Sequence, residues 1–216
     1  FVGVFLLACV ARLVSAFMFS RMMEPPPKET QRQKGDSRWY GKIGWQSPAG
    51  RLTTYVGFLY FGVGVAGPFF AIYALRDLGY PYLTYIAINV ASSIATVATL
   101  PLWGGLVDRR GNLWVLRIVS LGVSIVPMLW LVSPLSWYLV LMNVFAGAVW
   151  AGFNLAALNF IIGSSDENTR VATISYFRAS GALGAFAGAV VGGAIATHVP
   201  RIFPYQLMTL FLLSGM

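Results

Sequence analysis

The chain has 216 residues, of which 57% are hydrophobic and 10% are charged, and its formal net charge is +8. Soluble domains contain roughly 25% charged residues, so this composition excludes a water-soluble globule and predicts an all-α, polytopic membrane protein. The single Cys and the single His exclude an internal disulfide, a thiolate metal cluster and a multi-histidine site, so we expect neither a metal nor a cofactor.

The positive charge indicates a membrane topology rather than a nucleic-acid interface. Of the fifteen Lys and Arg residues, twelve lie in or next to every second loop between apolar runs, and the intervening loops hold two. Lys and Arg are retained on the cytoplasmic side of a membrane. We therefore predict that loops 21–52, 105–111 and 163–169 are cytoplasmic, and we do not expect nucleic acid as a partner.

The first apolar run, 1–20, is long enough to cross the roughly 30 Å hydrocarbon layer of a bilayer. Arg12 interrupts this run. It either snorkels towards the cytoplasmic face, which we favour, or belongs to a transport path. The chain begins with Phe1 and stops at Met216 inside an apolar run, so we interpret it as a segment of a longer protein.

A polar linker, 21–52, follows the first run and is the only predicted domain boundary. Pro25, Pro26 and Pro27 end any helix and predict a stiff, extended stretch. Residues 28–45 then mix basic and aromatic side chains. This mixture is typical of a segment that lies on the inner leaflet, and a disordered linker explains it equally well.

The apolar runs 53–75 and 82–104 each have a distinct face. In the first run, Tyr60 shares its face with Gly64 and Gly67. In the second run a polar stripe, within about 120° of arc, comprises Tyr85, Asn89, Ser92, Ser93, Thr96 and Thr99. Such a stripe must face protein or water, and hydrogen bonding between helices explains it somewhat better than substrate contact. We nevertheless keep Tyr60 of the first run, and Asn89, Ser93 and Thr96 of the second run, as candidates for a substrate cavity.

Between the apolar runs 82–103 and 112–132 lies the sequence G-G-L-V-D-R-R-G, residues 104–111. One Asp, two Arg and three Gly between two membrane-spanning segments cannot sit in lipid. They predict a tight, charged turn at one membrane face. The run after the turn has few polar residues, and we expect it to face lipid.

The run 137–162 carries Asn143, Gly147, Trp150 and Asn154 at offsets of 0, 4, 7 and 11, which places them within about 60° of arc on a helix. Two amides and an indole on one stripe of an apolar helix predict a cavity wall that binds a neutral or aromatic ligand. Packing between helices explains the same stripe equally well.

The run 170–197 is longer than a bilayer needs, and its uncharged part alone is long enough to cross one. We therefore expect Arg178 at the cytoplasmic interface rather than inside the membrane. Gly184, Gly188 and Gly192 recur every four residues and predict a groove for the close packing of another helix.

Together these features resemble the major facilitator superfamily. In that family a cytoplasmic turn of pattern G-x-x-x-D-[RK]-x-G-x-[RK]-[RK] joins two helices. Four positions match this pattern, namely Gly104, Asp108, Arg109 and Gly111. The two closing basic positions are instead Leu113 and Trp114, which departs from the pattern.

The order of elements is similar to the second part of that family's twelve-helix fold. By this resemblance, 1–20 is helix six, 21–52 is the cytoplasmic central loop, and 53–216 is the C-terminal bundle of helices seven to twelve, the last one truncated. The resemblance implies an N-terminal half of the same chain, and a cavity lined mainly by helices one, four, seven and ten. Helices seven and ten correspond to the runs 53–75 and 137–162.

The resemblance implies a secondary active transporter of a small molecule that works by alternating access, in the cell (inner) membrane and among its lipids. Asp108 would then latch the cytoplasmic side, and a turn needed only for topology is the alternative. We expect no enzymatic activity. The rival functions are a non-transporting receptor or scaffold of the same fold and, less favoured, a membrane-embedded transferase. None of the seven acidic residues lies inside an apolar run, so either a proton-coupling carboxylate lies in the N-terminal half or transport is not driven by protons.

Overall fold

The computed structural model describes residues 47–198 apart from Asn168, and a few residues nearer the termini, namely 10, 12–15, 17, 18, 21, 211, 214 and 215. The chain divides into two compact units, 1–36 and 37–216. In the first unit, the described residues from Val10 to Met18 are helical. The rest of the expected first helix and most of the expected linker lie outside the described residues.

Five long helices make up the described part of the second unit, in which no strand occurs. They are α3 (Pro48–Ile72), α4 (Tyr82–Arg110), α5 (Asn112–Leu129), α6 (Ser136–Gly163) and α7 (Arg170–His198), and a π-helical turn, η1 (Tyr73–Asp77), extends α3. All five are long and apolar enough to cross a membrane, with η1 taken as part of the first. The prediction of an all-α, membrane-spanning fold is therefore confirmed.

Helix α3 begins at Pro48, within the range expected to belong to the linker. The Ser47 side chain accepts a hydrogen bond from the backbone N–H of Gly50 (3.0 Å), and Pro48 occupies the first helical position. A serine cap followed by proline favours a helix start, because the cap satisfies an unpaired N–H and proline has none to satisfy. The helix therefore starts several residues before the boundary expected at residue 52, since capping residues and not the apolar run determine its start.

The charged segment 104–111 is helical apart from its last residue. Helix α4 continues through Arg110, and Gly111 alone separates it from α5, with a φ of +84°. Glycine adopts this conformation without the steric cost that a Cβ brings, and its N–H donates to the carbonyl oxygen of Val107 (2.8 Å). The expectation of a loop over 105–111 is corrected accordingly. A helix can extend past the hydrocarbon layer, so charged side chains need not interrupt it.

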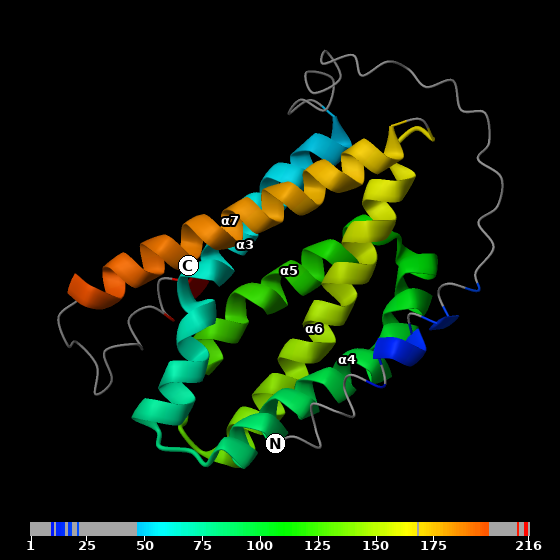
Figure 1. Cartoon of the computed structure of the whole chain (residues 1–216). Coiled ribbons are helices and arrows are strands. Elements are labelled where there is room, and N and C mark those ends of the chain that lie inside the picture. The colour runs from blue at the N-terminus through cyan, green and yellow to red at the C-terminus, as the bar shows by residue number, and fades with distance from the viewer. Residues whose placement is uncertain are drawn as a thin grey trace. The chain divides into compact units, whose positions relative to one another are not determined.

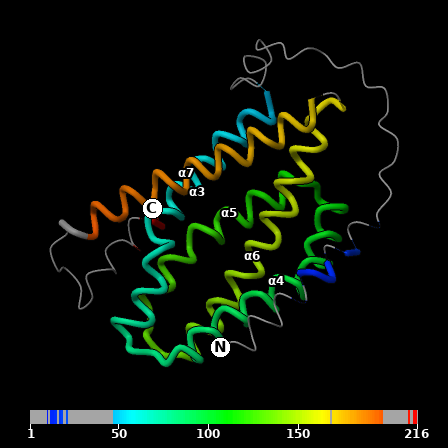
Figure 2. Tube along the Cα trace, in the orientation of Figure 1, coloured from blue at the N-terminus to red at the C-terminus, as the bar shows by residue number. Residues whose placement is uncertain are grey.

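Helices α3 and α7 lie side by side (Figures 1 and 2). Three glycines of α7 approach the α3 backbone so closely that an added Cβ would overlap a carbonyl group. They are Gly184, Gly188 and Gly192, which lie opposite Gly57, Phe61 and Val65, respectively. The Ser180 hydroxyl adds a hydrogen bond to the carbonyl oxygen of Thr53 (3.0 Å). The two backbones are therefore in direct contact, as small residues allow.

Helix α4 packs along α6 through both a close approach and side-chain hydrogen bonds. A Cβ added to Gly147 would overlap the backbone of Ser92. The Thr96 hydroxyl donates to the carbonyl oxygen of Gly147 (3.1 Å), and the Trp103 indole N–H donates to that of Ala148 (2.7 Å). These contacts fix the register of the two helices.

Helix α5 also packs against α6, although its run was expected to face lipid. Its buried side includes Val115, Val119 and Val123, whereas Ile118 and Leu121 are exposed. The buried residues recur every four positions, so one face of the helix meets protein and the opposite face does not. A shortage of polar residues therefore does not distinguish a lipid-facing helix from one that packs on one side.

Candidate functional site

One cavity of about 350 Å³ lies between α3, α4, α5 and α6, and we term it the amide cavity. Its lining residues that can hydrogen-bond through their side chains are Tyr85, Asn89, Ser92, Trp130, Asn143 and Trp150. Asn89 donates to the carbonyl oxygen of Tyr85 (2.8 Å), and Asn143 donates to that of Leu139 (2.9 Å). Each amide therefore uses one N–H on its own helix and keeps its oxygen and second N–H for a further partner.

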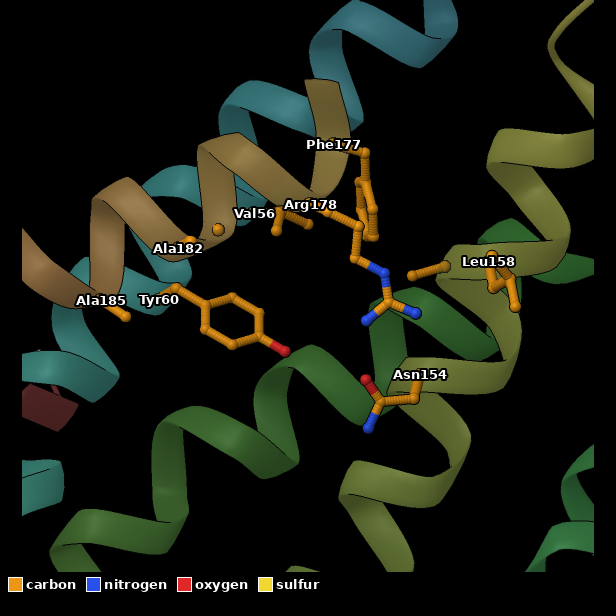
Figure 3. A pocket seen from close by; sticks show the side chains of 10 residues that line it. Val56, Tyr60, Asn154, Leu158, Phe177, Arg178, Ala182 and Ala185 are labelled. Carbon is orange, nitrogen blue, oxygen red and sulfur yellow. The ribbon is translucent and has the colours of Figure 1, made fainter. Parts of the chain in front are cut away.

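A second cavity of about 250 Å³ lies between α3, α6 and α7, and we term it the arginine cavity. Tyr60 from α3, Asn154 from α6 and Arg178 from α7 point their polar ends into the same space (Figure 3). Asn154 donates one N–H to the carbonyl oxygen of Trp150 (2.9 Å). The remaining lining residues are small or apolar, namely Val56, Ala157, Leu158, Phe177, Gly181, Ala182 and Ala185.

Arg178 is the charged residue among those that line the two cavities. It forms no ion pair with any residue that the structure describes, whereas Arg76, for example, pairs with Asp77 (2.8 Å). A guanidinium keeps its charge in proteins and has five N–H donors and no acceptor. The backbone of α7 cannot neutralise the charge of Arg178, whereas Asn154 is partly paired by a carbonyl oxygen of its own helix.

An aromatic pair separates the two cavities. Tyr60 of the arginine cavity and Trp150 of the amide cavity form an edge contact, with ring centroids 5.7 Å apart. Trp150 also forms an edge contact with the buried Phe153, at 5.6 Å. The two cavities are therefore neighbours, and the Tyr60–Trp150 pair is the wall between them.

The seven residues expected to line one substrate cavity are thus distributed over three environments. Five of them line the two cavities: Tyr60 and Asn154 in one, and Asn89, Asn143 and Trp150 in the other. The other two line neither cavity. Thr96 instead joins α4 to α6, and the exposed Ser93 donates to the carbonyl oxygen of Asn89 on its own helix (3.2 Å). The polar stripe of α4, which spans about 120° of arc, is wider than the part of that helix that lines the amide cavity. Some residues of the stripe therefore make other contacts.

Sequence reasoning missed Arg178 as a cavity residue, because its position near one end of an apolar run indicated the cytoplasmic interface. In the structure it shares one face of α7 with Ala182 and Ala185, which follow it by four and seven residues. Small side chains at these spacings leave room beside a long cation. An arginine followed by alanines at helical spacing was therefore the signal for a cavity-facing charge.

The four motif residues lie at the junction of α4 and α5, namely Gly104, Asp108, Arg109 and Gly111. Asp108 and Arg109 are exposed. The guanidinium of Arg110 lies 5.3 Å from the centroid of the Trp114 ring, a cation–π contact that links the two helices. Trp114, which departs from the family pattern, thus has a structural contact across the junction.

A family model described as Major Facilitator Superfamily matches residues 52–216. No curated protein and no solved structure matches the chain. The match includes nearly all of the five helices that are long and apolar enough to cross a membrane. The protein is therefore an integral, multi-pass membrane protein of a transporter family, and the chain belongs to the Major Facilitator Superfamily.

Proposed function

We propose that this chain supplies the C-terminal half of a secondary active transporter, which carries a small molecule across the cell membrane by alternating access. The observation that carries this proposal is the presence of two polar cavities among membrane-spanning helices of a transporter family. Polar and charged groups at such positions are costly in lipid and are typical of a substrate pathway. The family's other bundle would cover the open sides of both cavities.

The two cavities follow one another along α6. Asn143 lines the amide cavity and Asn154 lines the arginine cavity, and eleven residues of helix place them about 17 Å apart along the axis. A substrate that moves along α6 therefore meets the amides on one side of the Tyr60–Trp150 pair and Arg178 on the other. We infer that the aromatic pair controls passage between the two cavities.

We further propose that the α4–α5 junction helps to close the cytoplasmic side. Asp108 is exposed at the end of α4, where a carboxylate can bond a helix N-terminus or an Arg of the other bundle. The Arg110–Trp114 contact supports the junction by roughly 0.5–1 kcal/mol. If the junction serves only topology, Asp108→Asn will leave the transport rate unchanged.

The orientation of the bundle can be tested without knowing the substrate. Ser133 lies in the connection between α5 and α6, and Ser164 directly follows α6 at its other end. In a protein without other cysteines, we expect an impermeant thiol reagent to label Ser133→Cys, and not Ser164→Cys, on intact cells. Labelling of both from outside would contradict the proposed threading.

The transport function is tested by uptake into proteoliposomes that contain the complete protein, with a panel of anionic, neutral and cationic small molecules. We expect at least one molecule to accumulate, and Asn143→Ala and Asn154→Ala to reduce its uptake. Ser93→Ala is the matched control, because Ser93 is exposed, lines neither cavity and bonds only its own helix. Absence of uptake for the whole panel would favour a receptor or scaffold. Normal uptake by both Asn variants would remove the two cavities from the pathway.

A further inference from the structure

We propose that the arginine cavity binds the carboxylate of an organic monocarboxylate, with Arg178 as its charge partner and Tyr60 and Asn154 as neighbouring hydrogen-bonding groups. This inference rests on the proposed transport function and names the class of molecule that the same pathway selects. The substrate is an anion with a single carboxylate and an apolar or aromatic body.

The positive charge of Arg178 requires compensation. Arg178 lies eight residues into α7, or about 12 Å along the helix axis from its start. A charged side chain that points into the space between membrane-spanning helices needs a partner or a water-filled cavity. Among the residues that the structure describes, no Asp or Glu lines either cavity. A ligand that carries negative charge would supply the partner.

The direction of the Arg178 side chain indicates where its partner would lie. Arg178 extends away from α7 and towards Asn154 on α6, with the Tyr60 hydroxyl beside the same space (Figure 3). A side chain that snorkels to lipid headgroups would instead follow its own helix towards the membrane surface. Arg178 is exposed, and the direction of its side chain favours a partner in the space between α3, α6 and α7 over a headgroup phosphate.

The hydrogen-bond donors around this space suit a carboxylate. A guanidinium presents parallel N–H groups that match the two oxygens of a carboxylate. The Tyr60 hydroxyl can donate a further hydrogen bond. The Asn154 nitrogen points away from Arg178 and donates to the carbonyl oxygen of Trp150, whereas its oxygen lies on the Arg178 side (Figure 3). Donors from two helices, Arg178 of α7 and Tyr60 of α3, thus face one space (Figure 3), and a carboxylate can accept from both.

The surroundings of these donors indicate which anion fits. The cavity has one cation and walls of Val56, Leu158 and Phe177, so a monoanion with an apolar body matches it better than a phosphate dianion, which clusters of cations bind. Gly181, Ala182 and Ala185 leave room on the α7 side. The volume of about 250 Å³ is below that of drug-sized ligand pockets, and suits a carboxylate attached to a short apolar or aromatic group.

The charge preference can be measured without knowing the natural substrate. The complete protein is purified in detergent with its native cysteines replaced and with Ala182→Cys as the reporter. Its labelling rate is compared for an anionic and a cationic methanethiosulfonate of similar size. We expect the anionic-to-cationic rate ratio to exceed that of the Ser93→Cys reference by about tenfold. Arg178→Gln should remove this preference, and Arg178→Lys, which keeps the charge, should retain it.

The carboxylate itself is tested by protection of the same cysteine. Phenylacetate should slow the labelling of Ala182→Cys, whereas phenylacetamide, a neutral molecule of nearly the same shape, and inorganic phosphate should not. In Arg178→Gln, the phenylacetate concentration needed for half-protection should rise by about 10- to 100-fold, because a hydrogen-bonded charge partner is lost.

Three outcomes would overturn the inference. They are no protection by phenylacetate, equal protection by phenylacetamide, and stronger protection by inorganic phosphate, which would indicate a headgroup-like phosphate site. The measurement is made in detergent and needs no transport, so the two proposals can fail separately. Protection without uptake in proteoliposomes would refute transport alone, and uptake without protection would refute the carboxylate site alone.

Discussion

The amide cavity and the arginine cavity are neighbours that differ in how their polar groups are satisfied. Asn89 and Asn143 each donate one N–H to a carbonyl oxygen of their own helix, so the amides of this cavity are partly paired without a ligand. Arg178 forms no ion pair within the described residues. A helix can satisfy an amide that it carries, but it cannot neutralise a cation. A single charge therefore says more about the ligand than a stripe of amides does.

The walls of the two cavities also differ. The arginine cavity is framed by α3 and α7, whose backbones touch through glycines. The amide cavity lies beside α4 and α6, which side-chain hydrogen bonds join. Three glycines of the first wall cannot be substituted without forcing two backbones apart, whereas the second wall has one such glycine, Gly147, and its other contacts are single hydrogen bonds. We therefore expect the two walls to differ in how much stability a single change removes.

The largest effect is expected for Gly188→Leu, in the wall of the arginine cavity. Any side chain there overlaps the backbone of Phe61, which cannot rotate away, so the loss of stability should reach or exceed the roughly 1–3 kcal/mol that is typical of overpacking. Gly193→Leu is the matched control, because a Cβ at Gly193 meets no atom within 4 Å. The measurement is the thermal unfolding midpoint in detergent. Equal midpoints for the two variants would show that the close α3–α7 contact is not formed.

A smaller effect is expected for Trp150→Ala, which removes the wall between the cavities. The variant loses ring contacts to Tyr60 and Phe153, each worth about 0.5–1.5 kcal/mol beyond the buried area. The control is Trp137→Ala, since that indole is 61% exposed. A fall of the unfolding midpoint no larger than that of the control would argue against an ordered aromatic pair.

The smallest effect is expected for Thr96→Val, which removes the hydrogen bond from α4 to the carbonyl oxygen of Gly147. Such bonds within membranes contribute on average about 0.6 kcal/mol, so the unfolding midpoint should fall only slightly below that of Ser93→Ala. Phenylacetate protection in the arginine cavity should not change. A change in protection would show that the two cavities are coupled through α6 more strongly than their separate walls suggest.

The order and type of the helices could be predicted from the sequence, because apolar runs of bilayer length leave few alternatives. Two element boundaries could not. Ser47 and Pro48 start α3 inside a segment that composition indicated was linker, and Gly111 alone ends α4 where a longer loop was expected. In both places one or two residues with special backbone properties determine the boundary, and an average over a hydrophobic window does not detect them.

The candidate site was predictable only in part. Helical periodicity shows which residues share one face of a helix, but it does not show which neighbouring helix or cavity that face meets. Asn143 and Asn154 share one stripe of α6, yet they line different cavities, since the Tyr60–Trp150 pair lies between them. The four-residue glycine spacing indicated close packing, but only the structure identifies α3 as the partner helix. The direction of the Arg178 side chain could not be predicted, because depth along a helix does not indicate which neighbouring helix a side chain faces.

The central claim is that the arginine cavity communicates with each side of the membrane in turn. The most direct measurement uses the complete protein with a single cysteine, Ala182→Cys, in right-side-out and inside-out membrane vesicles treated with an impermeant anionic thiol reagent. We predict labelling from both sides, with any ligand that increases labelling from one side decreasing it from the other. Labelling from one side only, under all conditions and with every ligand of the panel, would contradict alternating access.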